Sequence, residues 1–344
     1  MKSFSIPFMN IFLRCLFINC FLIITIQSFI IASEVKENDS DNKSLINKTT
    51  EIVDDTHQLL SEQVSSASDI VDSFFGEERM DGHYNKSKIK LNFTTTFDEE
   101  GKSTSAMGLS TSLILPRTQK KLNLIVEDAK KNFESDDLSD TGGSQTQNNA
   151  TTDTGTESTL SAAIQYKIFD TKNWTIDTKT GVIFSDPDFD PYARLRFRRS
   201  FYLENDWESR FTQLFRWSPL RNLEESTGLV FDKTINKQLL FRIKNGISWR
   251  EKTGLFSLGH GYSLYHQLAS NKALEYFSNI SGIHEPKIYT TSYDVGIAYR
   301  QMVYNNWIFF EIISPLIVWS REKPDESFKQ TNAIIVKLDF VFGG

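Results

Sequence analysis

A two-residue alternation of apolar and polar side chains is the feature that most constrains how this chain can fold. From Lys88 onward, Ile89, Leu91, Phe93 and Phe97 alternate with polar neighbours, and similar stretches recur to the end of the chain. Successive side chains of a strand point to opposite faces, so each stretch predicts an amphipathic β-strand. The stretches run for about 10 to 12 residues, roughly twice the length usual in globular sheets.

Fourteen stretches have this pattern. They cover 86–97, 105–116, 120–127, 158–169, 173–185, 191–202, 206–217, 224–235, 238–250, 254–266, 272–281, 287–301, 306–320 and 330–342. The third is short and the eighth and eleventh are weakly patterned, so twelve strands is the alternative. The facing of the thirteenth cannot be assigned, because apolar residues occur on both faces and Pro315 lies inside it.

Strand length separates a soluble sandwich from a membrane-spanning barrel. A strand that crosses lipid needs about 9 to 11 residues tilted near 45°, and a closed barrel leaves no backbone donor unpaired in hydrocarbon. We therefore predict an all-β fold, a membrane-spanning antiparallel up-and-down β-barrel of 12–14 strands over residues 86–344. The connections after odd-numbered strands are mostly longer, above all the predicted surface loop 128–157, as in bacterial outer-membrane barrels.

The six tryptophans fall at the ends of the predicted strands. They are predicted to form aromatic girdles at the two membrane interfaces, namely Trp174, Trp207 and Trp307 at one and Trp217, Trp249 and Trp319 at the other. At about 3.3 Å per residue and roughly 40° of tilt, Trp207 and Trp217 are about 25 Å apart along the membrane normal. The alternative is that tryptophan favours strand ends in any β protein.

Residues 1–33 are predicted to be a signal peptide that directs export. A mainly apolar run from Cys15 to Ala32 follows Lys2, and cleavage is expected near Ser33. An uncleaved anchor helix is the alternative, since a run of about 18 residues is just long enough to span a bilayer. Both cysteines of the chain, Cys15 and Cys20, lie in this segment, so the cleaved chain contains none.

Residues 34–85 are predicted to form an acidic periplasmic segment with an amphipathic helix at about 50–75. The apolar stripe of this helix consists of Val53, Leu60, Val64, Ala67, Val71 and Phe74. Glu34–Met80 contains 12 acidic and 4 basic residues, a net charge of −8. This helix is expected to plug or gate the barrel, and the alternative is a free or self-associating periplasmic helix.

The end of the chain resembles an assembly signal. Leu338, Phe340 and Phe342 share one face of the last strand, as in the terminal aromatic signal by which the barrel-assembly machinery recognises bacterial outer-membrane proteins, although Gly343 and Gly344 follow.

Three short motifs carry a second resemblance. Residues 72–76 (DSFFG), 86–91 (KSKIKL) and 113–116 (LILP) resemble an uncharacterised family of proteobacterial outer-membrane β-barrel proteins. This resemblance implies the barrel architecture only. It implies no activity. An even number of strands returns the end of the chain to the side on which the helical segment lies, and an exported chain enters from the periplasm, so we expect a place in the outer membrane of a Gram-negative cell with the helix on the periplasmic side.

Basic residues prevail on the polar faces of the predicted strands. The predicted lumen-facing set is Lys88, Lys90, Arg194, Arg196, Arg198, Arg210, Arg216, Arg242, Lys244, Arg250 and Arg300, against the acids Asp177, Glu208, Asp232 and Asp294. The whole chain carries −6, of which the leader contributes +2, Glu34–Met80 −8 and residues 128–157 −5, so the remaining residues carry +5. A basic lumen favours anions. The alternative is that these arginines pair with acids on neighbouring strands and fill the interior.

Composition and motifs narrow the classes of function. The five histidines lie apart from any catalytic constellation, and no metal-binding spacing is present. We therefore expect no cofactor. The net charge of −6 gives no reason to expect a nucleic-acid partner. We predict a non-enzymatic pore or conduit for small, anionic solutes, surrounded by outer-membrane lipid. The alternative is a non-conducting structural or interaction barrel that anchors the helix and displays its loops. Solute and oligomeric state are not determined by the sequence.

Overall fold

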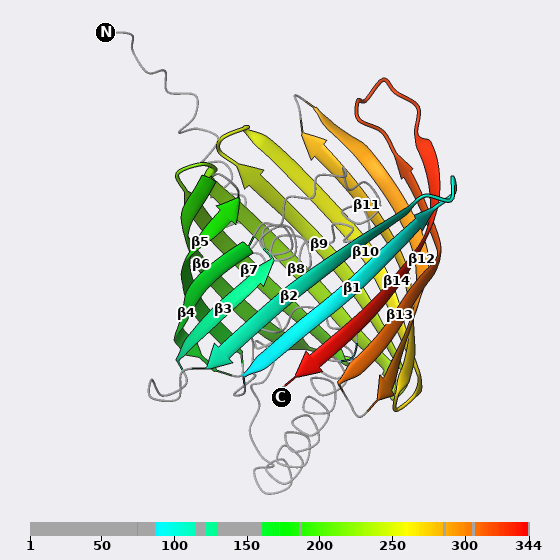
Figure 1. Cartoon of the computed structure of the whole chain (residues 1–344), viewed down its shortest axis with the longest axis horizontal. Coiled ribbons are helices and arrows are strands. Elements are labelled where there is room, and N and C mark those ends of the chain that lie inside the picture. The colour runs from blue at the N-terminus through cyan, green and yellow to red at the C-terminus, as the bar shows by residue number, and fades with distance from the viewer. Residues whose placement is uncertain are drawn as a thin grey trace, which may run out of the picture. The chain divides into compact units, whose positions relative to one another are not determined.

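The computed structural model describes residues 74, 87–114, 121–128, 160–171, 173–185, 188–284, 287–304 and 307–342. The described residues form fourteen strands (Figure 1). These are β1 (Lys88–Asp98), β2 (Ser103–Ile114), β3 (Leu122–Asp128), β4 (Leu160–Asp170), β5 (Trp174–Ser185), β6 (Asp188–Leu203), β7 (Trp207–Ser218), β8 (Asn222–Asn236), β9 (Leu239–Arg250), β10 (Leu255–Ala269), β11 (Lys272–His284), β12 (Ile288–Tyr304), β13 (Ile308–Ser320) and β14 (Lys329–Phe342). No helix in this part of the chain is long and apolar enough to cross a membrane.

The strands close into a single antiparallel barrel. Each strand pairs with its neighbours in sequence, and β1 pairs with β14, with Ile89 opposite Phe342 and Phe97 opposite Ile334. Figure 1 shows this seam, where the cyan β1 lies beside the red β14. The predicted closed, all-β, antiparallel barrel is confirmed, with fourteen strands, the upper end of the predicted range. The leader, the helix apart from Phe74, and residues 129–157 lie outside the described residues.

Several strands run farther than the alternation predicts. For example, β6 begins at Asp188 and β12 ends at Tyr304, because backbone pairing in an antiparallel ladder continues after the side-chain pattern has stopped. Most connections are therefore short at both ends of the barrel. The predicted difference in length between the connections at the two ends of the barrel comes mainly from two long connections, 129–159 and 321–328.

One short turn depends on residues that tolerate left-handed backbone. Asn205 and Asp206, between β6 and β7, have φ values of 58° and 59°. Asparagine and aspartate adopt this conformation at low cost because their short side chains bond the local backbone. This turn brings Trp207, the first residue of β7, directly opposite Leu203 of β6.

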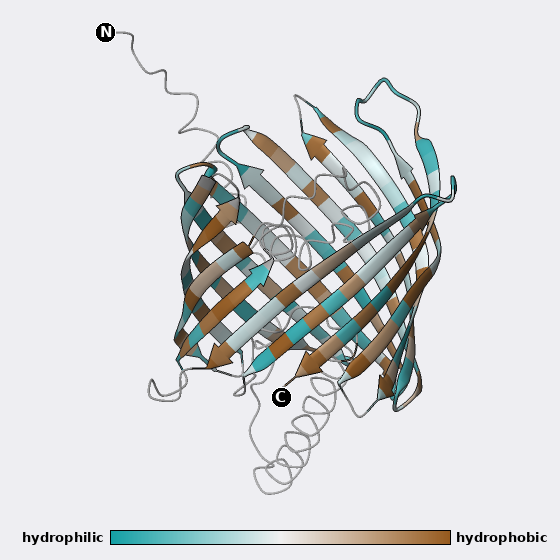
Figure 2. Cartoon of the chain, in the orientation of Figure 1, coloured by the Kyte–Doolittle hydropathy of each residue, from teal (hydrophilic) through white to brown (hydrophobic). Residues whose placement is uncertain are grey.

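The two faces of the sheet differ in chemistry, and brown and teal segments interchange along the strands in Figure 2. The outer face carries exposed apolar side chains such as Phe93, Ile164 and Phe184. Buried charged side chains, among them Asp177 and Arg242, lie on the inner face. Here the usual arrangement of a soluble protein is inverted, as a barrel in lipid requires.

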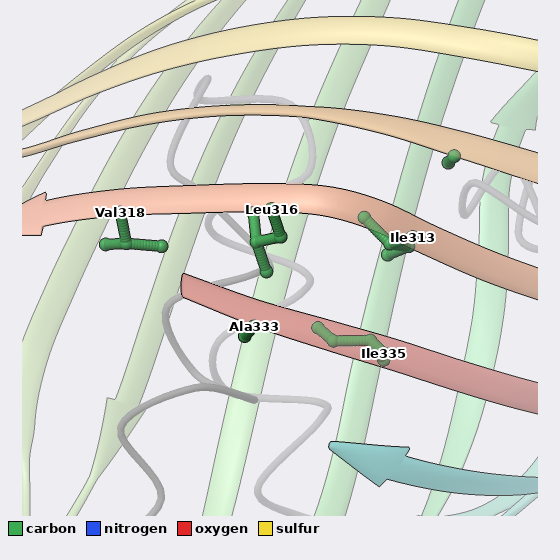
Figure 3. Packing of buried hydrophobic residues seen from close by; sticks show 6 residues of the cluster. Ile313, Leu316, Val318, Ala333 and Ile335 are labelled. Carbon is green, nitrogen blue, oxygen red and sulfur yellow. The ribbon is translucent and has the colours of Figure 1, made fainter. Parts of the chain in front are cut away.

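Strand β13 changes facing at an irregularity. Its register with β14 shifts between Ile313 and Leu316, and the Ser314–Pro315 peptide bond within this stretch is cis. As a result Ile313 and Leu316 both lie on the inner face, where they pack with Ala298, Val318, Ala333 and Ile335 (Figure 3). This bulge explains why alternation alone could not assign the strand, because a residue added to one strand reverses the facing that follows it.

Candidate functional site

The candidate site is the interior of the barrel, where charged side chains from neighbouring strands meet. Strand register places the eleven basic residues of the sequence prediction on the inner face. They are Lys88, Lys90, Arg194, Arg196, Arg198, Arg210, Arg216, Arg242, Lys244, Arg250 and Arg300. Adjacent strands in register present their side chains side by side, so pairs can form across the ladder.

Asp177 of β5 is the centre of one cluster. It is fully buried and accepts hydrogen bonds from Nη2 of Arg194 at 3.0 Å and Nε of Arg196 at 2.9 Å, both on β6. Gln165 of β4 donates its amide to the same carboxylate at 3.0 Å and accepts from Asn123 of β3 at 3.2 Å. Four consecutive strands are therefore joined through one carboxylate.

A second cluster lies at the seam of the barrel. Arg300 of β12 donates to Glu311 of β13 at 2.7 Å and to Asp339 of β14 at 2.8 Å. Lys337 donates to Glu311 at 2.8 Å, and Lys90 of β1 lies 3.3 Å from Asp339. Ion pairs thus join β12, β13, β14 and β1 across the seam that closes the sheet.

Further pairs lie on the opposite wall. Arg242 of β9 donates to both oxygens of Asp232 on β8, at 2.6 and 2.8 Å. Glu224 of β8 lies 3.2 Å from Arg216 and 3.5 Å from Arg250. Because these side chains are packed against carboxylates, the interior is partly filled by its own charged groups.

The inner face holds acids that the sequence prediction did not include. Glu311 lies on β13, and the sequence pattern did not show which face of that strand points inward. Asp339 of β14 and Glu224 of β8 could have been identified as inward-facing from the alternation along their strands. The missed signal was position: Glu311 and Asp339 alternate with outward apolar residues, as Asp339 does with Phe340, whereas Glu224 is followed by a second acid, Glu225.

An apolar cluster interrupts the charged interior near the end of the barrel where the even-numbered strands end. Its members are Leu240 of β9, Tyr265 of β10 and Ala273 of β11, with Met302 of β12 packed against them, and Phe74 lies in the same cluster. Leu240 and Ala273 each come one residue after the start of their strands. The cluster therefore lies close to the connections 237–238 and 270–271.

Phe74 is held there by aromatic contacts. Its side chain is 6% exposed, and its ring meets the ring of Phe309 edge to face, with centroids 6.1 Å apart and an angle of 86°. The guanidinium of Arg300 lies 4.8 Å from the centre of the Phe309 ring. Phe74 is the only described residue of the predicted helix. One side chain, Phe309, links it to the ion pairs of the seam, because the ring of Phe309 contacts both Phe74 and Arg300.

The tryptophans lie at or beside strand ends, in two sets. Trp174 and Trp207 begin β5 and β7, and Trp307 immediately precedes β13. In the second set, Trp217, Trp249 and Trp319 each lie one residue before the end of their strand, β7, β9 and β13. Figure 1 shows that these strands run in the same direction, so the two sets occupy opposite ends of the barrel.

The terminal residues Leu338, Phe340 and Phe342 share the outer face of β14. Phe340 contacts Phe93 of β1 with centroids 6.0 Å apart, and Phe342 contacts Trp307 at 5.4 Å. These contacts cover the outside of the seam that the ion pairs close from within.

Comparisons with known proteins return barrels. No family model matches the sequence, and no curated protein matches it. Solved structures with similar folds include OprB of Pseudomonas putida, with 8% identity over 77% of this chain and 96% of that chain and a TM-score of 0.44. A bacterial polysaccharide outer membrane secretin has 10% identity over 76% of this chain and 99% of that chain, with a TM-score of 0.42. The COG4313 outer membrane channel of Pseudomonas putida F1 has 9% identity over 75% and 94%, with a TM-score of 0.36.

The secretin and the COG4313 channel are outer-membrane proteins by their descriptions. Because the TM-scores of these three structures lie below 0.5, the fold assignment rests on the closed strand order of this chain itself.

Proposed function

We propose that this protein spans the outer membrane as a pore or conduit for small anionic solutes, and that its acidic N-terminal segment plugs or gates the lumen from the periplasmic side. The observation that carries the proposal is the burial of Phe74 among inner-face residues of β9, β10, β11 and β13. A segment before the first strand that places a side chain inside the barrel occupies space that a solute would need.

The charges of the two parts support the same arrangement. Glu34–Met80 carries a net charge of −8, and basic residues prevail on the inner face of the barrel. Within a confined wall of low dielectric constant, such a field attracts anions and an acidic segment alike. The plug and the solute therefore compete for the same positive interior.

Conductance of single molecules in a planar bilayer tests the proposal. The mature protein is compared with a version that lacks residues 34–80 and with Phe74→Ala. We expect the deletion to open an anion-preferring pore, and Phe74→Ala to increase the fraction of time spent open, because the edge-to-face contact with Phe309 is lost.

Phe93→Ala is the matched control. Phe93 makes an edge-to-face contact with Phe340 at 6.0 Å and 87°, close to the geometry of Phe74 and Phe309, but it lies on the outer face. The control should conduct as the unmodified protein does. If Phe93→Ala opens the pore as much as Phe74→Ala does, the effect comes from a weakened barrel and the plug is refuted.

A non-conducting structural barrel is the second candidate. The fully buried ion pair of Arg242 and Asp232, together with the apolar cluster around Leu316, favours it because these side chains fill the interior. Absence of conductance in both the full protein and the deletion would establish this candidate and exclude transport.

A further inference from the structure

A polar patch on the outer face of β7 to β10 is at odds with a surface that faces only lipid. Register places Gln213 opposite Thr227 and Asn245 opposite His260, with Glu225 opposite both Phe215 and Trp249. Phe215 and Trp249 belong to the outer face, since their neighbours Arg216 and Arg250 bond Glu224 on the inner face. We define the polar patch as Gln213, Glu225, Thr227, Asn245 and His260.

Hydrogen bonds within the patch satisfy only part of its polar atoms. Thr227 donates to Gln213 at 2.7 Å, and Gln213 donates its amide to Oε1 of Glu225 at 2.9 Å. Nδ1 of His260 lies 2.7 Å from Oδ1 of Asn245. Among the described residues, Oε2 of Glu225 and Nε2 of His260 have no hydrogen-bonding partner. The imidazole of His260 is a group that hydrocarbon cannot solvate, whereas Glu225 lies opposite Trp249, near the membrane interface.

The pair of Asn245 and His260 lies well inside the apolar band. Asn245 is four residues before Trp249 on β9, which at roughly 3.3 Å per residue and about 40° of tilt is about 10 Å from the level of that tryptophan. Interfacial water and headgroups at the level of Trp249 therefore do not reach it. Other parts of the outer face present exposed apolar side chains, such as Tyr293 and Val295 on β12 and Ile334 on β14.

A recess lies beside the patch on the same face. It has a volume of about 430 Å³, and Phe241, Tyr262, Tyr276, Val295 and Pro315 line it, with Ser278 among the smaller lining residues. Tyr262 joins the two features, because its ring contacts His260 edge to face with centroids 4.5 Å apart. Exposed apolar side chains lie across the patch from the recess, including Trp217, which is 53% exposed.

We propose that this face binds a second copy of the same chain. The patch offers both hydrogen-bond donors and acceptors, so the free donors of one copy can pair with the free acceptors of the other around a two-fold axis. The side chain of Trp217 or Ile247 from one copy then fills the recess of its partner. The six strands β7 to β12, at about 4.8 Å spacing across a band of about 25 Å, present a face of roughly 700 Å² per copy. Two convex barrels bury part of this face, an area below the roughly 800 Å² per copy of a standard interface.

Charge argues against lipid as the occupant. The patch contains no lysine or arginine, so it offers no fixed positive charge to the phosphates of an anionic headgroup. Acyl chains can fill the recess but cannot hydrogen-bond His260 or Asn245.

The test is the oligomeric state of the exported full chain, extracted in mild detergent and measured by light scattering during size-exclusion chromatography. The variant Gln213→Leu/Asn245→Leu/His260→Leu removes three of the five hydrogen-bonding side chains of the patch, including both that lie well inside the apolar band, while keeping similar volume. We expect a dimer for the unmodified protein and at least a tenfold weaker dimer for the variant. The matched control is Thr95→Val/Ser105→Ala, which removes a hydrogen-bonded pair of 3.0 Å on the exposed face of β1 and β2 and should remain dimeric.

A cysteine cross-link identifies the occupant. The only cysteines of the chain lie in residues 1–33, so Ile247→Cys introduces a single thiol into the cleaved protein. A homodimeric disulfide in whole membranes, absent for Phe93→Cys, supports the proposal. A monomer at all concentrations, a variant that dimerises as tightly as the unmodified protein, or cross-linking to a different protein overturns it. The proposal rests on the membrane location, which fractionation tests separately: a chain found outside the outer membrane refutes the location, whatever its oligomeric state.

Discussion

Pairing between Arg242 and Asp232 offers the sharpest test of the idea that buried ion pairs hold neighbouring strands together. Arg242 is 0% exposed and donates two hydrogen bonds to one carboxylate. Each hydrogen bond to a charged group contributes about 1.5–3 kcal/mol. Asp232→Asn keeps the shape of the side chain, removes its charge and leaves only one of its two terminal atoms able to accept from Arg242. We expect it to lower the free energy of unfolding by about 1.5–3 kcal/mol.

Urea unfolding from detergent micelles, followed by tryptophan fluorescence, measures this change. The double variant Asp232→Asn/Arg242→Met replaces both charges, so it should cost less than the two single variants together by about 2 kcal/mol or more. Glu100→Gln, which breaks an ion pair with Lys102 in an exposed turn, is the control and should leave the free energy of unfolding unchanged. Additive single effects, or a cost below about 1 kcal/mol for Asp232→Asn, would refute the reasoning.

Three further predictions address the wall, the lumen and the seam. A Cβ at Gly181 would lie 2.5 Å from both the carbonyl oxygen of Ala162 and the Cβ of Ala163, so Gly181→Ala should lower the free energy of unfolding by about 1–3 kcal/mol in the same urea assay; an unchanged midpoint contradicts this. Lys88→Glu/Lys90→Glu should shift the reversal potential of the open pore in a salt gradient toward cations, and an unmoved potential means that these lysines do not set selectivity. Phe342→Ala, which loses the contact with Trp307, should slow assembly into the heat-resistant folded form seen by gel mobility, and an unchanged rate removes Phe342 from the assembly signal.

Strand identity could be predicted from the sequence because alternation is local. Each residue of β1 or β12 reports its own facing through its neighbours, and backbone pairing then closes the sheet in sequence order. Strand β13 was the exception. Its irregularity at Ser314 and Pro315 reverses the facing within one strand, which a two-residue period cannot express.

The ion pairs of the lumen could not be predicted, because they depend on register between strands. Knowing that Arg300 faces inward does not reveal that Glu311 and Asp339 lie beside it, since a slip of one residue on either strand would turn those acids outward. The site of Phe74 was hidden for the same reason. Its apolar character is evident in the sequence, but the surface that receives it is assembled from several strands.

Pairing with acids and a positive lumen are compatible, although the sequence presents them as alternatives. Asp177 bonds two arginines, Arg194 and Arg196, and Glu224 lies within ion-pair distance of both Arg216 and Arg250. At the seam, the three bases Arg300, Lys337 and Lys90 share the two acids Glu311 and Asp339.

In each of these three clusters the ion pairs given above join bases that outnumber the acids by one. The carboxylates therefore hold the cationic side chains in place. We therefore propose that the pairs that stabilise the barrel also position the groups that attract an anionic solute, because a positive charge fixed in a confined, low-dielectric wall attracts anions without first having to reorganise.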